Sequence, residues 1–150
     1  MTNQLLEEAS LDLLETVPLV MRTLRTEMRH GRQHDLSVPQ FRTLAFVHRE
    51  PGASLTALAE HLGLTPASTS KMVDALVERQ LLTRSTAEED RRRIELNLTP
   101  AGLKVWQTAF EQTRASFAQR LSQLPEADLE QLCASLNRIK PLFRPTPPTE

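Results

Sequence analysis

The chain has 150 residues, of which 39% are hydrophobic and 25% charged. This composition suits one domain with a buried core, and no apolar run approaches the length that spans a membrane. The glutamate-rich start lacks the pattern of a signal peptide, and the single Cys133 excludes an intrachain disulfide, so we expect a cytoplasmic protein without membrane contact. The formal net charge of −1 gives no global attraction to phosphate, so any contact with nucleic acid must depend on locally placed cations.

Residues 1–37 carry an apolar stripe with helical spacing. Its members are Leu5, Leu6, Ala9, Leu13, Val17, Val20, Met21, Leu24 and Met28. Pro18 interrupts the stripe, and it either kinks this helix or starts a second one behind Thr16.

Two short helices are predicted next, separated by a turn of a few residues. Ser54 can cap the first, which carries apolar residues at i, i+3, i+4 and i+7 from Leu55, and Gly63 can close it in a left-handed conformation. Thr65 can cap the second, with Pro66 at its first position. Thr69, Met72, Val73 and Leu76 form the buried face of this second helix. The pattern is typical of a helix-turn-helix.

The opposite face of the second helix is small or hydrogen-bonding. Small side chains let a helix enter a DNA major groove, and hydroxyl and ammonium groups can reach phosphates or base edges. The free N–H groups and positive dipole end of the first turn also suit a phosphate. The residues we predict to contact DNA from this region are Ser54, Thr65, Pro66, Ala67, Ser68, Ser70 and Lys71.

After Arg79 the apolar period changes from helical to alternating, which predicts a β-hairpin. One strand covers residues 81–84, and Ile94, Leu96 and Leu98 face the core from the other. The turn between them carries the predicted DNA-contacting residues Asp90, Arg91 and Arg92, and Arg93, at the start of the returning strand, completes this set. Arginine at a hairpin tip beside a recognition helix is suited to the minor groove. The alternative is that Glu88, Glu89 and Asp90 only neutralise the arginines on a solvated loop.

The C-terminal part predicts two more helices with apolar stripes, one through Leu103, Trp106 and Phe110 and one after Pro125. A compact winged helix cannot cover all of this surface, so we expect the remaining stripes to pack against a second chain. We therefore predict one mainly α domain over residues 1–150 with a small β-wing. It consists of a winged helix-turn-helix over 38–99, dimerisation helices over 1–37 and 100–143, and a flexible tail over 144–150.

With these segments the chain resembles the multiple antibiotic resistance regulator (MarR) family. The matching stretches are residues 36–41, 58–60, 68–76, the Asp-Arg-Arg of 90–92, and Leu-Asn-Leu-Thr-Pro-Ala-Gly of 96–102. The resemblance implies a homodimer that binds a short pseudo-palindromic duplex operator, usually represses, and releases DNA when a small molecule or an oxidant acts. It also implies that Arg92 enters the minor groove, held by Asp90. Gln80 departs from the family, which usually has glycine there, so we expect the preceding helix to end differently or to carry strain.

The resemblance further implies an effector pocket where the dimerisation helices meet the winged helix, taking a small aromatic or apolar acid. By position alone, its lining would include Met28, Phe41, Ala45, His48 and Trp106. Trp106 has the alternative of being an ordinary core residue. No cofactor is implied.

Other chemistry finds little support in the sequence. His30 and His34, with His48 or His61, do not complete a recognisable metal-ligand spacing, so we predict no metal site. Cys133 lies on an apolar helix face, which favours a buried inert thiol over a redox sensor. The chain has no phosphate loop or nucleophile motif, so we predict no enzyme activity. The competing hypothesis is a winged helix that binds another protein without binding DNA, which would expose an aromatic or aliphatic patch.

Overall fold

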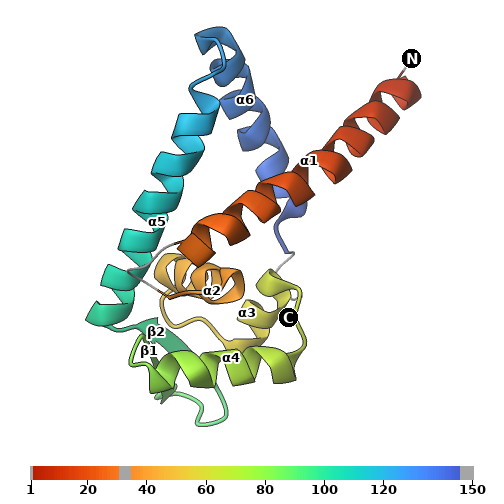
Figure 1. Cartoon of the computed structure of the whole chain (residues 1–150). Helices are drawn as coiled ribbons and strands as arrows, with labels where there is room; N and C mark the ends of the chain where they lie inside the picture. The colour runs from red at the N-terminus through yellow and green to blue at the C-terminus, as the bar shows by residue number, and fades with distance from the viewer. Residues whose placement is uncertain (1, 31–34, 146–150) are drawn as a thin grey trace.

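The computed structural model describes residues 2–30 and 35–145, and it is mainly helical with one small sheet (Figure 1). This confirms the predicted fold class. Of the sequence predictions, His34 and residues 146–150 of the proposed tail lie outside the described residues. The elements are α1 (Thr2–His30), α2 (Val38–Arg49), α3 (Leu55–Leu62), α4 (Pro66–Glu78), β1 (Leu82–Thr86), β2 (Ile94–Leu98), α5 (Pro100–Leu121), α6 (Glu126–Ile139) and the 3-10 helix η1 (Lys140–Phe143).

Side-chain caps begin four of these helices, because a hydroxyl oxygen can satisfy an N–H group that has no partner within the helix. Ser54 accepts a hydrogen bond from the backbone N–H of Ala57 (3.0 Å). Thr65 accepts one from Ser68 (3.2 Å), with Pro66 at the first helical position. Ser37 and Thr99 cap α2 and α5 in the same way. The predicted caps of α3 and α4 are therefore confirmed, as is the left-handed Gly63 (φ 67°) after α3.

The core lies between α2, α3, α4 and the hairpin. The largest fully buried side chains include Leu44, Leu58, Val73, Leu76 and Leu96. In the hairpin, Leu82 pairs with Leu98 and Thr86 with Ile94 in an antiparallel register. Leu96 is buried while Ile94 and Leu98 pack partly buried against the core, as the alternation predicts. The prediction of β1 over 81–84 is wrong by one residue at its start and two at its end, because the ladder continues to Thr86.

The junction between α4 and β1 shows how the chain accommodates the unusual Gln80. Gln80 has φ 61°, a left-handed conformation that glycine adopts without steric cost. The hydroxyl of Thr99, at the start of α5, donates a hydrogen bond to the Gln80 carbonyl (2.6 Å) and so stabilises this conformation. The expected strain at this position is therefore present, and α4 still ends in a left-handed turn.

Long helices extend from the winged helix on both sides (Figure 1). Pro18 lies inside α1, which continues as one helix, so no second helix starts there. No residue of α6 is buried within the described chain. The prediction that Cys133 is buried is wrong for the single chain, in which the thiol is exposed.

Candidate nucleic-acid interface

The first turn of α4 presents a small, polar surface to solvent. Thr65, Pro66, Ala67, Ser68 and Lys71 are exposed, and Ser70 is half-buried. Thr69, Val73 and Leu76 hold the opposite face of the helix in the core. The face that we predicted to contact DNA is therefore uncovered in the described chain.

The cap of α4 uses part of the hydrogen-bonding capacity of this turn. Pro66 has no N–H, and the N–H of Ser68 is already bonded to Thr65. The Thr65 hydroxyl also donates to Ser68 Oγ (3.0 Å), which leaves the Ser68 hydroxyl proton for another acceptor. In the described part of the chain, the backbone N–H of Ala67 is the one N–H group of the first turn that remains free to bind a phosphate. We expected several such groups.

Ser54 lies at the start of α3, and its half-buried side chain is engaged in capping. Its hydroxyl oxygen accepts from Ala57 N–H, so a contact with DNA would use the hydroxyl proton. The structure thus shows a structural role for Ser54, and its predicted DNA contact stays a prediction.

The hairpin turn is shaped by its own backbone and by Asp90. Ala87 N–H donates to the Arg93 carbonyl (2.9 Å), and Arg93 N–H donates to the Asp90 carbonyl (3.0 Å). The Asp90 carboxylate accepts from the backbone N–H of Arg92 (2.9 Å). Asp90 therefore orders the backbone on which Arg92 is carried, as aspartate commonly does in turns.

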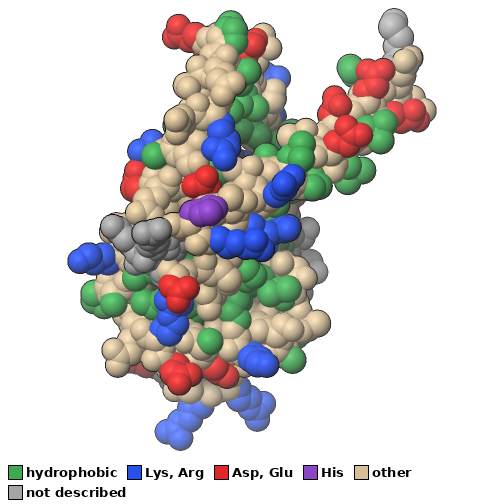
Figure 2. All heavy atoms as spheres, in the orientation of Figure 1, with side chains coloured by type: hydrophobic (Ala, Val, Ile, Leu, Met, Phe, Trp, Pro, Cys, Tyr) green, Lys and Arg blue, Asp and Glu red, His purple; other side chains and the backbone are tan. Residues whose placement is uncertain are grey.

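The three wing arginines project from the molecule. Arg91, Arg92 and Arg93 are exposed, and Lys and Arg side chains extend from the lower end of the surface in Figure 2, where Figure 1 has the β1–β2 turn. None of the ion pairs among residues 2–30 and 35–145 involves these arginines, Glu88 or Glu89. The alternative of a self-neutralised loop therefore finds no ion pair to support it.

An ion pair that we did not predict connects α4 to the wing. The guanidinium of Arg84, on β1, donates to the carboxylate of Asp74, on the side of α4 next to the hairpin. Arg84 lies on a strand and Asp74 on a helix, ten residues apart in the sequence. No local sequence pattern therefore predicts that the two side chains meet. The contact helps to set the orientation of the wing relative to α4.

The five residues predicted to line an effector pocket lie in two places. His48 and Trp106 stack with ring centroids 4.3 Å apart, and Trp106 continues onto Phe110 (5.3 Å). Phe41 and Trp106 also pack against the core, and Ala45 is half-buried on the same helix as Phe41. Trp106 Nε1 is buried without a hydrogen-bond partner in the described structure.

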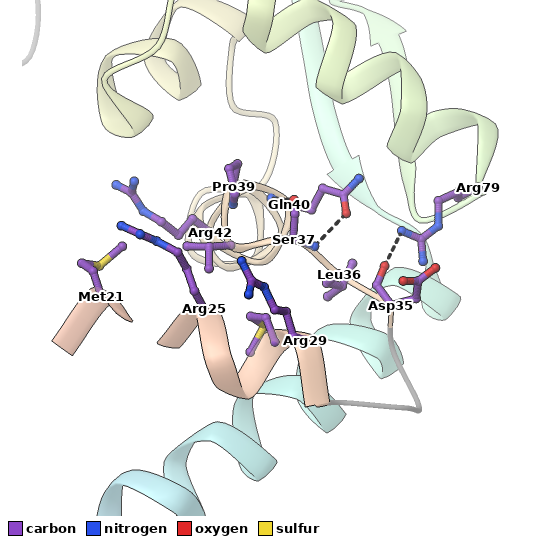
Figure 3. Close-up of a pocket in the computed structure, with 12 residues that line it drawn as sticks. Met21, Arg25, Arg29, Asp35, Leu36, Ser37, Pro39, Gln40, Arg42 and Arg79 are labelled. Carbon is purple, nitrogen blue, oxygen red and sulfur yellow. Dashed lines mark hydrogen bonds between the residues drawn. The ribbon is translucent and has the colours of Figure 1, made fainter. Parts of the chain in front are cut away.

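Met28 instead lines a pocket of about 860 Å³ formed by α1, the start of α2 and the end of α4 (Figure 3). Of the five predicted residues, Met28 alone belongs to its lining. Four of its twelve lining residues are arginines, Arg25, Arg29, Arg42 and Arg79, which we did not foresee.

The histidines and acidic side chains form no candidate metal site within residues 2–30 and 35–145. No group of three or more His, Cys, Asp or Glu side chains lies close enough there to hold a metal ion. His61 stacks on Phe46 with centroids 4.6 Å apart. Its burial, and then the charges of Arg42 and Arg49, lower the pKa of His61 below the ordinary value of 6.5.

The chain has two short helices, the second of which keeps one face uncovered, and an arginine-tipped hairpin follows them. This arrangement defines a winged helix-turn-helix protein. The MarR family model matches residues 34–93. The uncharacterized HTH-type transcriptional regulator YhbI of Bacillus subtilis (strain 168) is 31% identical over 108 residues, which cover 70% of each chain. This protein belongs to the MarR family of transcriptional regulators.

Solved structures share the fold along nearly the whole chain. RV1404 from Mycobacterium tuberculosis has a TM-score of 0.77 and 26% identity, covering 95% of this chain and 97% of that one. Streptococcus pneumoniae FabT, solved in complex with DNA, has a TM-score of 0.68 and 17% identity, covering 94% and 96%. None of the described helices is both long and apolar enough to cross a membrane.

Proposed function

We propose that this protein is a homodimeric repressor that binds a pseudo-palindromic duplex operator in the cytoplasm and responds to a small-molecule effector. The observation that carries the proposal is the juxtaposition of the uncovered first turn of α4 with a turn whose three arginines form no ion pair in the described chain. The FabT structure, which shares this fold, contains DNA, and this likeness supports duplex DNA as the partner.

In this proposal α4 enters the major groove and the wing follows the neighbouring minor groove. Ala67 N–H, the Ser68 hydroxyl and Lys71 face the DNA from α4, where they can meet phosphates or base edges. Arg92 supplies charge to the minor groove from the turn that Asp90 orders. Ser54, Thr65, Pro66, Ser70, Arg91 and Arg93 complete the proposed contact surface.

A homodimer is supported by the exposed apolar side chains outside the winged helix. Leu14 and Leu19 of α1 are 73% and 62% exposed, and Phe143 at the other end of the chain is 72% exposed. Monomeric proteins rarely expose so much clustered apolar surface, and a second copy would bury it symmetrically. We propose that residues 1–37 and 100–143 form the interface, burying roughly 2,000 Å² or more, as obligate interfaces do.

The proposed effector is a small aromatic or apolar acid near the junction of the dimerisation helices with the winged helix. Phe41, Ala45, His48 and Trp106 remain the proposed lining, whereas Met28 lines the separate pocket of Figure 3. The unpartnered Nε1 of Trp106 supports this, since a buried donor without a partner is unusual and a ligand oxygen would satisfy it.

DNA binding is tested by fluorescence anisotropy with an operator duplex selected from a random pool and a scrambled duplex. We expect Arg92→Ala to weaken operator binding by about 1–3 kcal/mol. Lys71→Ala should lower affinity for both duplexes and reduce the salt slope by about 0.9 per lost contact if Lys71 meets only phosphate. If Lys71 reads a guanine, its loss should relax discrimination at one position in each half-site.

Arg49→Ala is the matched control, because Arg49 is exposed at the end of α2 and lies outside both the proposed DNA-contacting residues and the proposed dimer interface. It should bind like the wild type. Wild-type affinity of both Arg92→Ala and Lys71→Ala for both duplexes would refute DNA binding by this surface.

The dimer is tested by light scattering at micromolar protein concentration. The double variant Leu6→Gln/Leu14→Gln removes two exposed apolar side chains from α1 and should shift the protein toward monomer. Its control, Glu7→Gln/Glu15→Gln, changes polar neighbours on the same helix and should stay dimeric. A folded wild-type monomer at this concentration would contradict the proposed assembly.

A further inference from the structure

The C-terminal end of α4 is bonded to the segments that carry the dimerisation helices. Within the winged helix, α4 packs against α3 and β1. Among residues 2–30 and 35–145, neither α1 nor α5 packs extensively against α4. The three residues that follow α4 nevertheless make direct contacts with the start of α5 and with the residue that precedes Leu36 and the α2 cap. We call these three residues, Arg79, Gln80 and Leu81, the α4 joint.

On one side, the α4 joint is bonded to the chain between α1 and α2. Arg79 donates a hydrogen bond from Nη1 to the Asp35 carbonyl (3.0 Å), and Figure 3 shows its side chain reaching from the end of α4 to that carbonyl. Asp35 precedes Leu36, which is buried in the core, and Ser37, which caps α2. The bond therefore ties the end of α4 to the well-packed start of α2, close in sequence to the dimerisation helix α1.

On the other side, the α4 joint is bonded to the start of α5. The Thr99 hydroxyl donates to the Gln80 carbonyl (2.6 Å), and the backbone N–H of Thr99 donates to the Leu81 carbonyl (3.1 Å). The same hydroxyl accepts the N–H of Gly102 (2.9 Å) and so caps α5. One side chain thus begins the dimerisation helix and holds the α4 joint, so the first turn of α5 and the end of α4 are fixed relative to each other.

Two unusual backbone conformations lie at these contacts. In the described chain, the non-glycine residues with positive φ are Asp35 (46°) and Gln80 (61°). Residues other than glycine enter this region at a cost in free energy, and they persist where surrounding contacts hold them. Here each carbonyl is held by a side chain from another element, that of Asp35 by Arg79 and that of Gln80 by Thr99. The two hydrogen bonds therefore stabilise the connections on both sides of the α4 joint.

We propose that Arg79 and Thr99 are positioning residues for operator recognition, because they fix the recognition helix relative to the dimerisation helices. This inference rests on the proposed function, since it concerns the spacing of two α4 helices in a homodimer. A dimer reads two half-sites at a set separation, so a rigid α4 joint makes it reject a duplex whose half-sites are moved. Arg79 acts from a distance, since the 13 residues of α4 place it about 20 Å from the first turn.

The test compares duplexes that differ in the spacing of their half-sites. Fluorescence anisotropy measures the affinity of the full chain for the selected operator and for the same duplex with one base pair inserted at its centre. The insertion moves one half-site by about 3.4 Å and rotates it around the helix axis. We expect the wild type to prefer the operator by about tenfold or more, and Arg79→Ala and Thr99→Val each to narrow this preference by about three- to tenfold.

Two matched variants separate position from charge and from local structure. Thr99→Ser keeps the hydroxyl and should keep the wild-type preference. Arg49→Ala removes the same charge as Arg79→Ala from an exposed position at the end of α2, and it should also keep the preference. A general loss of attraction to phosphate lowers affinity for both duplexes by the same factor and leaves their ratio unchanged. Circular dichroism melting and light scattering check that each variant is folded and dimeric.

The outcomes distinguish this inference from the proposed function. A wild type that binds neither duplex, or binds both equally, would overturn the proposed operator recognition and the inference with it. A wild-type preference that persists in Arg79→Ala and Thr99→Val would overturn the inference alone and assign the coupling to the packing of α3 on α4. Equal narrowing in Thr99→Ser and Arg49→Ala would also overturn it. If Thr99→Val does not fold, the comparison of Arg79→Ala with Arg49→Ala decides.

Discussion

Gly102 is the residue at which a single methyl group should separate local helix preference from tertiary packing. It lies in the first turn of α5 and packs directly against the backbone of Leu81, the residue that follows the left-handed Gln80. A Cβ at Gly102 would lie 2.0 Å from the carbonyl oxygen of Leu81 and 2.9 Å from its carbonyl carbon. That oxygen already accepts the backbone N–H of Thr99 (3.1 Å), so it cannot move away without breaking this bond.

The expected effect of Gly102→Ala is the difference between two terms. Overpacking against a core typically costs about 1–3 kcal/mol, and a clash with backbone belongs at the upper end. Alanine returns up to about 1 kcal/mol of helix propensity. We therefore expect a net loss of about 2 kcal/mol in the free energy of unfolding, which corresponds to a fall in Tm of roughly 4–8 °C for a chain of this size.

Urea denaturation at fixed protein concentration measures this loss, because the stability of a dimer depends on concentration. Ala101→Gly, one residue earlier and exposed, is the matched control and should cost no more than about 1 kcal/mol, since it changes helix propensity alone. A Gly102→Ala protein as stable as the wild type would refute the argument from close approach.

Three further outcomes are expected. Gln80→Gly should stabilise the fold by about 0.5–1 kcal/mol in urea denaturation, because it relieves a left-handed residue (φ 61°) at some entropic cost; an equal gain from Gln80→Ala would contradict this explanation. Arg84→Ala should change stability by less than about 1 kcal/mol, since its pair with Asp74 is partly exposed, yet it should weaken operator binding by more than that in anisotropy titrations; unchanged operator affinity would exclude a positioning role. Because burial lowers the pKa of His61, its contribution to stability is complete above pH 6.5 and is lost as pH falls below that value, so His61→Gln should flatten the acid limb of a stability–pH curve.

The sequence alone was sufficient for the elements of the winged helix and for their buried faces. Capping by Ser54 and Thr65, the left-handed Gly63 and the alternation through Leu96 all depend on residues within a few positions of one another. Such local preferences are written directly in the order of residue types. The resemblance to the MarR family was available for the same reason, since its motifs are contiguous.

Tertiary structure decided what depends on residues far apart in the chain. The contact of Gly102 with Leu81, the ion pair of Arg84 with Asp74 and the arginine-lined pocket each unite separate elements. The exposure of Cys133 was likewise decided by tertiary structure, because no residue of α6 is buried in the described chain although one face of the helix is apolar. Periodicity shows which side of a helix is apolar, but only the packed chain determines which partner that side meets, because burial depends on distance in space.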